Sequence, residues 1–325
     1  MKLNSIYTLI ACLFLTACSS EADWLPNEQT PEPENGKVNV QLNLQVPTFT
    51  VEETRASNPL DLQIENPMYN LWLLHYNEEG GLVEQDTKYI HLDDNGKLAT
   101  QYTAQLTLGG GTTGTICLIA NLEGTPIHNP QSVNSPSNDK GLWPKTLQLL
   151  QKELLTLPID PKVTDATLGL PTKMVMYGYY QGELTSRYPV NITLGRMTAR
   201  LDIIIGSATG YSFTNLTLQL KNAVIKTHYS PLKIVNDDAN SYVDFPEDKT
   251  FANKTITNSS KITCYYFTGE NITPEIGQET MLIIKATKNR KVYTYNIKLG
   301  ANAPGTSDDY SLYRNNNYTF NINLK

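Results

Sequence analysis

A run of alternating residues near the amino terminus constrains the fold of this chain most. From Val38 to Val46, every second side chain is apolar, and the residues between them are Asn or Gln. Successive side chains of a β-strand point to opposite faces, so this pattern predicts a strand that is buried on one side. The predicted buried set is Val38, Val40, Leu42, Leu44 and Val46.

Similar short runs separated by turn residues continue through the rest of the sequence. The chain holds 19 Tyr residues and lacks long runs of Leu, Ala, Glu and Lys, which favours strands over helices. Many short strands with frequent turns predict a mainly β protein built from β-sandwiches. The last run, residues 317–324, alternates again, and its predicted buried set is Tyr318, Phe320, Ile322 and Leu324.

One helix is expected, from Pro144 to Leu155. Pro144 suits a first helical position, because its missing N–H has no partner there in any helix. The residues Leu147, Leu150 and Leu154 fall on one stripe at helical spacing. Pro158 ends the pattern, so the helix is short.

The first residues of the chain indicate export. Residues 1–17 have the features of a signal peptide, with a positive charge near the start and an apolar run too short to span a membrane. Residues 15–18, Leu-Thr-Ala-Cys, resemble the lipobox of bacterial lipoproteins. In that family the Cys, which is Cys18 here, carries lipids such as palmitate. The alternative is an ordinary Cys after a plain signal peptide. Residues 18–37 are polar and rich in Pro, so they predict a tether with little to bury.

A polar stretch from Glu52 to Pro59 follows the first predicted strand and is expected to be exposed. A proteolytic cut between Arg55 and Ala56 would separate that strand from everything after it. The alternative is that residues 38–46 form a permanent strand and that Arg55 is an incidental loop residue.

The composition argues against several function classes. A net charge of −6 disfavours nucleic acid as a partner. The four His residues are scattered, residues 93–96 lack the later ligands of a calcium loop, and no Gly-Lys-Ser/Thr follows the Gly-rich residues 109–114. We therefore expect no catalytic constellation, no metal and no cofactor, and a protein that is not an enzyme.

Two aromatic groups could stack on sugar rings, although aromatic residues in strands more often form core or cross-strand pairs. They are Tyr177, Tyr179 and Tyr180, and Tyr265, Tyr266 and Phe267.

Two cysteines remain once the amino-terminal segment is set aside. Cys117 and Cys264 both lie in apolar, strand-like runs. A disulfide between them is one interpretation in an oxidising compartment, and two buried thiols are the favoured one.

A boundary near residue 188 divides the predicted strands into two domains, at residues 38–188 and 189–325. Within the first domain, residues 38–55 form the segment that a cut at Arg55 would remove.

Five segments of the chain, taken in sequence order, carry a family resemblance: residues 70–83, 116–121, 170–174, 190–203 and 310–322. They resemble segments of the fimbrillin superfamily, the subunits of type V pili. In the same order, they look like its first core strand and hairpin, its buried strand ending in Ala-Asn, its Leu-Pro-Met segment, the strand opening its second domain, and its closing signature.

The resemblance implies two tandem transthyretin-like β-sandwich domains, with the short helix in the first. It also implies a route. The precursor is lipidated and exported to the outer membrane and cell surface, an Arg-specific protease frees the first strand, and a strand of another pilus subunit fills the vacated groove. Adhesion to a host protein or glycan is the implied role.

One departure concerns the carboxyl end, where Lys325 directly follows the last predicted strand. Shaft subunits of the family are expected to carry a donor extension there. We therefore rank a tip or minor subunit first, a shaft subunit second and a lipidated anchor third. The alternative from another class is a monomeric, surface glycan-binding lipoprotein.

Overall fold

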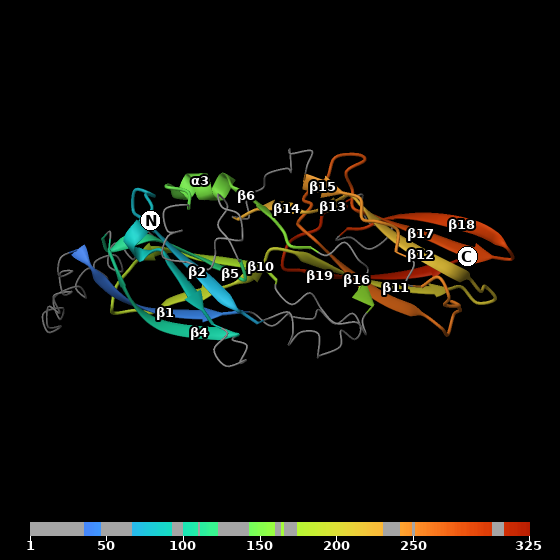
Figure 1. Ribbon diagram of the computed structural model, residues 1–325, viewed down its shortest axis with the longest axis horizontal. Helices are drawn as coiled ribbons and strands as arrows, with labels where there is room; N and C mark the ends of the chain where they lie inside the picture. Colours follow the sequence, from blue (N-terminus) through green and yellow to red (C-terminus); the bar gives the residue numbers. More distant parts are fainter. Residues whose placement is uncertain are drawn as a thin grey trace, which may run out of the picture. The chain divides into compact units, whose positions relative to one another are not determined.

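The computed structural model (Figure 1) describes a mainly β chain, as the sequence predicts. Gly36–Lys325 forms one compact unit. The residues that the structure describes are 36–46, 67–92, 100–109, 111–122, 143–159, 164–165, 174–229, 241–248, 251–300 and 309–325.

Two sheets face each other across a first apolar core, and together they are called the first sandwich. One is five-stranded, in the order β10-β8-β5-β2-β3, and the other is three-stranded, in the order β4-β1-β9. The core between them takes apolar side chains from both sheets, such as Leu42 and Leu106 from one and Leu73 and Leu118 from the other. The strands are β1 Val38–Gln45, β2 Asn70–Asn77, β3 Lys88–His91, β4 Gln101–Leu108, β5 Thr113–Ala120, β8 Met176–Glu183, β9 Val190–Thr193 and β10 Gly195–Arg196.

A second pair of sheets encloses a second core, and this pair is called the second sandwich. Its sheets have the orders β19-β11-β16-β7 and β12-β17-β18. Leu201, Ile203, Leu218 and Ile284 are among the fully buried residues between them. The strands are β7 Thr164–Asp165, β11 Ala199–Ser207, β12 Thr214–Lys221, β16 Ile262–Thr268, β17 Met281–Lys288, β18 Lys291–Lys298 and β19 Asn317–Leu324.

Two short strand pairs complete the sheets of the described residues. β6 (Leu154–Thr156) pairs with β14 (Lys226–His228), and β13 (Ala223–Val224) pairs with β15 (Tyr242–Val243). The first of these pairs joins the segment after the helix to a segment far along the chain.

The predicted helix exists but is shorter than expected. It is α3, Leu147–Lys152, and the side chain of Thr146 caps it by accepting a hydrogen bond from the backbone N–H of Leu149. The predicted start at Pro144 and end at Leu155 are wrong. The helix ends early because residues 154–156 pair with β14 instead, and this pairing requires an extended backbone.

The five-stranded sheet is covered on both faces. Trp72 and Cys117 point away from the first core, into a further apolar cluster with Trp143, Leu150 and Tyr229. The segment holding α3 supplies part of this cover (Figure 1). This burial on two faces explains why the run from residue 116 to 120 is apolar without alternation.

The change from one core to the other does not coincide with the predicted boundary at residue 188. β9 and β10 follow that residue, yet both belong to sheets of the first sandwich, and Val190 and Ile192 pack in its core. The strands of the second sandwich resume at Ala199 with β11. The division of the chain into domains at this point stays a prediction.

Among the described residues, no helix is long and apolar enough to cross a bilayer. In the same residues, no three potential metal-binding side chains gather into one group.

Candidate functional site

The strand β1 lies in the middle of its sheet, between two strands that have no other ladder partner in that sheet among the residues that the structure describes. β1 runs antiparallel to β4 along its whole length, from Val38 opposite Leu108 to Gln45 opposite Gln101. Its other edge runs parallel to β9, from Leu42 opposite Val190 to Gln45 opposite Thr193. The alternation predicts a strand here but not this central place. Removing β1 would leave both neighbours without a partner.

The apolar face of β1 is buried as the alternation predicts. Val40 and Leu42 are 0% exposed, and Leu44 is 3% exposed. Val38 and Val46 are buried as well. Burying five such side chains contributes roughly 8–15 kcal/mol as an upper bound, at about 1.5–3 kcal/mol each.

The opposite face of β1 carries a row of amide side chains. The Nε2 of Gln41 donates to the Oδ1 of Asn43 at 3.2 Å, and the Nδ2 of Asn43 donates to the Oδ1 of Asn191 on β9 at 3.0 Å. The hydroxyl of Thr107 on β4 donates to the Oδ1 of Asn39 at 2.8 Å. This face is solvated, so it adds pairing specificity rather than burial.

A buried Asp–His pair holds the far end of β4 independently of β1. The backbone N–H of Gly109, directly after β4, donates to Oδ2 of Asp86 at 2.7 Å. The Nδ1 of His75 on β2 lies 2.8 Å from the same oxygen, and the two side chains are 0% and 6% exposed. Asp86 therefore ties β4 to the five-stranded sheet.

No sequence pattern predicts this pair. In the sequence His75 is one of four scattered His residues, and in the structure it is fully buried. Asp86 lies in a single 3-10 turn, η2 (Glu84–Asp86), and its side chain is buried. His75 and Asp86 do not belong to a recognisable sequence motif.

The closing strand β19 differs from the prediction. Only Leu324 of its predicted set is fully buried, while Tyr318, Phe320 and Ile322 are partly buried against the second core. The reason is position: within the described part of the chain, β19 is the outermost strand of its sheet and pairs on one side only, parallel to β11. The prediction of a uniformly buried set is therefore wrong for three of its four members.

The predicted lipid attachment site Cys18 and the predicted cleavage site Arg55–Ala56 lie outside the described residues. Both stay predictions.

Tyr265, Tyr266 and Phe267 are buried in β16, so the core interpretation of this group is confirmed. The group at β8 is divided, with Tyr177 buried and Tyr179 53% exposed.

Cys117 and Cys264 are buried thiols that form no disulfide, on β5 and β16 in different sandwiches, so the favoured interpretation is confirmed and the disulfide is not. Burial raises the pKa of Cys117 to about 12, although the hydrogen bond from the Tyr177 hydroxyl opposes this shift. Only the thiolate reacts with alkylating agents.

We expect Cys117 of the folded protein to resist iodoacetamide at pH 8. Its thiolate fraction is about a thousand-fold below that of a thiol with the ordinary pKa of 9.0, and buried sulfur is also shielded from the reagent. Peptide-level mass spectrometry should find Cys117 unmodified in native protein and fully alkylated in urea. Equal labelling in both conditions would contradict the buried position.

Neither a protein-family model nor a curated protein sequence matches this chain. Several solved structures do match it. A "putative cell adhesion protein" from Parabacteroides distasonis is 18% identical, with 89% of each chain covered and a TM-score of 0.59.

The tip fimbrial protein Mfa3 from Porphyromonas gingivalis, truncated at its C-terminus, is 15% identical. The likeness covers 89% of this chain and 95% of that one, with a TM-score of 0.56. At such identities the likeness establishes the fold. This chain therefore has the same fold as the tip fimbrial protein Mfa3 and the Parabacteroides protein, which is the fold that its resemblance to the fimbrillin superfamily implies.

Proposed function

We propose that this protein is a fimbrial subunit that is exported as a lipoprotein to the cell surface and assembles by strand exchange. In this scheme β1 fills its own sheet in the precursor. An Arg-specific protease cuts after Arg55, β1 leaves, and a strand from another subunit takes the place between β4 and β9. The role is structural and adhesive rather than enzymatic.

The observation that carries this proposal is the central place of β1 in the order β4-β1-β9. A strand lost from the middle of a sheet leaves two unpaired backbone edges as well as an apolar floor. A donated strand satisfies all three at once, which is the physical basis of β-strand addition. Arg55 lies between β1 and β2 in the sequence, where a cut would free β1 from the rest of the chain.

Adhesion is proposed from the fold shared with the Parabacteroides protein and Mfa3, whose names describe cell adhesion and a fimbrial tip. Lipidation at Cys18 would hold the precursor at the outer membrane until the cut removes the anchored segment. Multiple acyl chains anchor stably, so release depends on proteolysis.

Limited digestion with an Arg-specific protease tests the scheme. We expect a cut after Arg55, a new amino terminus at Ala56, and a shift of the trimmed protein from monomer to oligomer. Amino-terminal sequencing reads the cut, and size-exclusion chromatography with light scattering reads the mass. A fluorescent peptide of residues 37–46 should bind the trimmed protein, once the released strand is removed, and not the intact one.

Two variants sharpen this experiment. Arg55→Ala should abolish both the cut and the oligomers. Arg187→Ala is the matched control, because Arg187 is exposed between β8 and β9 and a cut there would leave β1 joined to β4 along the chain. The proposal fails if the Arg55→Ala variant oligomerises like the parent after protease treatment. It also fails if the trimmed protein does not bind the peptide of residues 37–46.

A further inference from the structure

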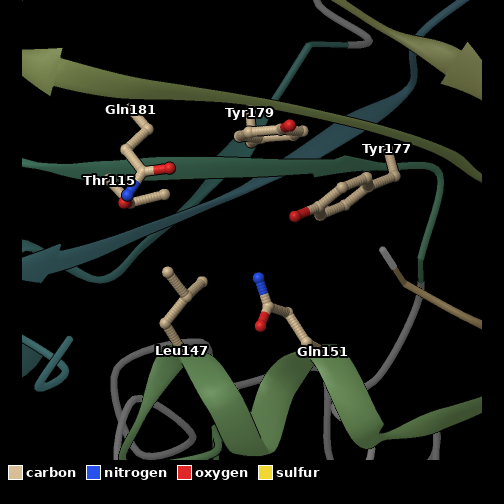
Figure 2. A pocket seen from close by; sticks show the side chains of 6 residues that line it. All are labelled: Thr115, Leu147, Gln151, Tyr177, Tyr179 and Gln181. Carbon is tan, nitrogen blue, oxygen red and sulfur yellow. The ribbon is translucent and has the colours of Figure 1, made fainter. Parts of the chain in front are cut away.

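A small pocket opens beside α3, on the face of the five-stranded sheet that points away from the first core. Figure 2 shows Leu147 and Gln151 of α3 facing side chains of β5 and β8. The cavity measures about 70 Å³, room for several water molecules. Its lining residues are Thr115, Leu147, Gln151, Tyr177, Tyr179 and Gln181.

The strand periodicity explains why these side chains meet. Tyr177, Tyr179 and Gln181 alternate along β8, so they share one face of the sheet. Thr115 on β5 lies opposite Gln181 in the antiparallel register and joins the same face. The helix closes the side of the pocket opposite the strands, with its Gln151 turned toward them (Figure 2).

The lining is aromatic and polar but uncharged. Tyr179 is 53% exposed, and its ring stacks on Tyr177 with centroids 6.1 Å apart and an interplanar angle of 30°. A hydrogen bond holds Tyr177 in place, since its hydroxyl donates to the Sγ of Cys117 at 3.5 Å. A rigid, outward ring of this kind offers an apolar face at little cost in side-chain entropy.

Two side-chain amides flank this ring. Each amide offers two donors and an acceptor oxygen, and neither Gln151 nor Gln181 hydrogen-bonds another side chain among the described residues. Vicinal hydroxyls of a sugar present both donors and acceptors, with which such amides can hydrogen-bond. With no cationic side chain in the lining, an anionic ligand has nothing to pair with.

We propose that this pocket is a subsite for one residue of a neutral glycan, with Tyr179 as the stacking surface and Gln151 and Gln181 as the hydroxyl partners. Pockets that enclose drug-sized ligands measure about 300–1,000 Å³. This cavity is much smaller, so it contacts only one edge of a pyranose ring. The affinity for a single sugar is therefore on the order of millimolar. The inference names a ligand class for the proposed adhesive role but does not depend on strand exchange.

Saturation-transfer NMR on the full chain, with β1 in place, tests the subsite. The probes are the methyl glycosides of glucose, galactose, mannose and N-acetylglucosamine, with glucuronic acid and N-acetylneuraminic acid as charged comparisons. We expect saturation of at least one neutral glycoside and none of the acids. Tyr179→Ala should reduce the signal at least ten-fold, whereas Tyr179→Phe should keep most of it.

Tyr188→Ala is the matched control, because Tyr188 is 61% exposed and does not line the pocket. It should bind like the parent. The inference is overturned if no neutral glycoside is saturated, if only the acids are, or if Tyr179→Ala and Tyr188→Ala lose signal equally. These outcomes are independent of cleavage at Arg55, so failure here leaves the strand-exchange proposal standing, and the reverse also holds.

Discussion

Replacing Leu42 by Asp is expected to lower the free energy of unfolding of the first sandwich by about 5 kcal/mol or more. The side chain is 0% exposed in the centre of β1. Truncating a buried Leu costs about 2–5 kcal/mol, and an unpaired buried carboxylate adds several more. Since whole domains are stable by about 5–15 kcal/mol, this change should unfold the sandwich or leave it barely stable.

Tryptophan fluorescence during urea unfolding measures this loss locally. Trp72 and Trp143 are both buried in the cluster behind the five-stranded sheet. The third Trp, Trp24, lies outside the described residues and should be changed to Phe in all variants. The matched control is Gln41→Asp, which places the same charge one residue away on the exposed face. It should change stability by about 1 kcal/mol or less.

The same variant separates general instability from a vacated groove. If the Leu42→Asp change displaces β1 alone, an added peptide of residues 37–46 with the native Leu should restore the native fluorescence, because binding to the folded state stabilises it by mass action. The control Gln41→Asp should not respond to the peptide. Equal stability of the two Asp variants would mean that β1 does not fill the core.

How far the sequence predicts this fold depends on how local each feature is. The alternation at Val38–Val46 depends only on neighbouring residues, so it correctly predicts both the strand and its buried face. The central place of β1 depends on pairing with β4 and β9, of which β9 lies near residue 190. No local pattern records which distant strand is the neighbour, or on which side it pairs.

The errors have the same cause. Leu154 continues the apolar stripe of α3, but pairing with His228 draws it into a strand. Tyr318 and Phe320 alternate as a buried face would, yet β19 has a neighbour on one side only and they stay partly exposed. In both cases tertiary contacts override a correct local pattern. The pocket could not be predicted from any local pattern, since Gln151 and Gln181 become neighbours only through the packing of α3 on β8.

Asp86→Ala is expected to cost about 2–6 kcal/mol, because it leaves two buried polar groups unpaired at roughly 1–3 kcal/mol each. These are the backbone N–H of Gly109 and the Nδ1 of His75. Asp86→Asn should lose much less, since an amide oxygen in the place of Oδ2 still accepts from both Gly109 and His75 and only the charge is lost. Urea unfolding followed by Trp72 and Trp143 fluorescence measures both variants.

The control is Glu84→Ala in the same turn. Glu84 forms an ion pair with Lys145, but both side chains are more than half exposed, so the expected loss is about 1 kcal/mol or less. Comparable losses in Glu84→Ala and Asp86→Ala would mean that the turn as a whole matters and that the buried carboxylate does not.

The Asp86→Ala change should have a larger effect once β1 has been removed. In the intact chain, β4 is held by its ladder to β1 and by the Asp86–Gly109 hydrogen bond. After cleavage at Arg55 and loss of β1, this hydrogen bond and the packing of Leu106 and Leu108 in the first core keep the end of β4 against the five-stranded sheet. Trimmed Asp86→Ala protein should therefore bind the residue 37–46 peptide at least ten-fold more weakly than trimmed parent, while trimmed Glu84→Ala binds normally. Equal peptide affinity for all three would show that apolar packing alone keeps the vacated groove in shape.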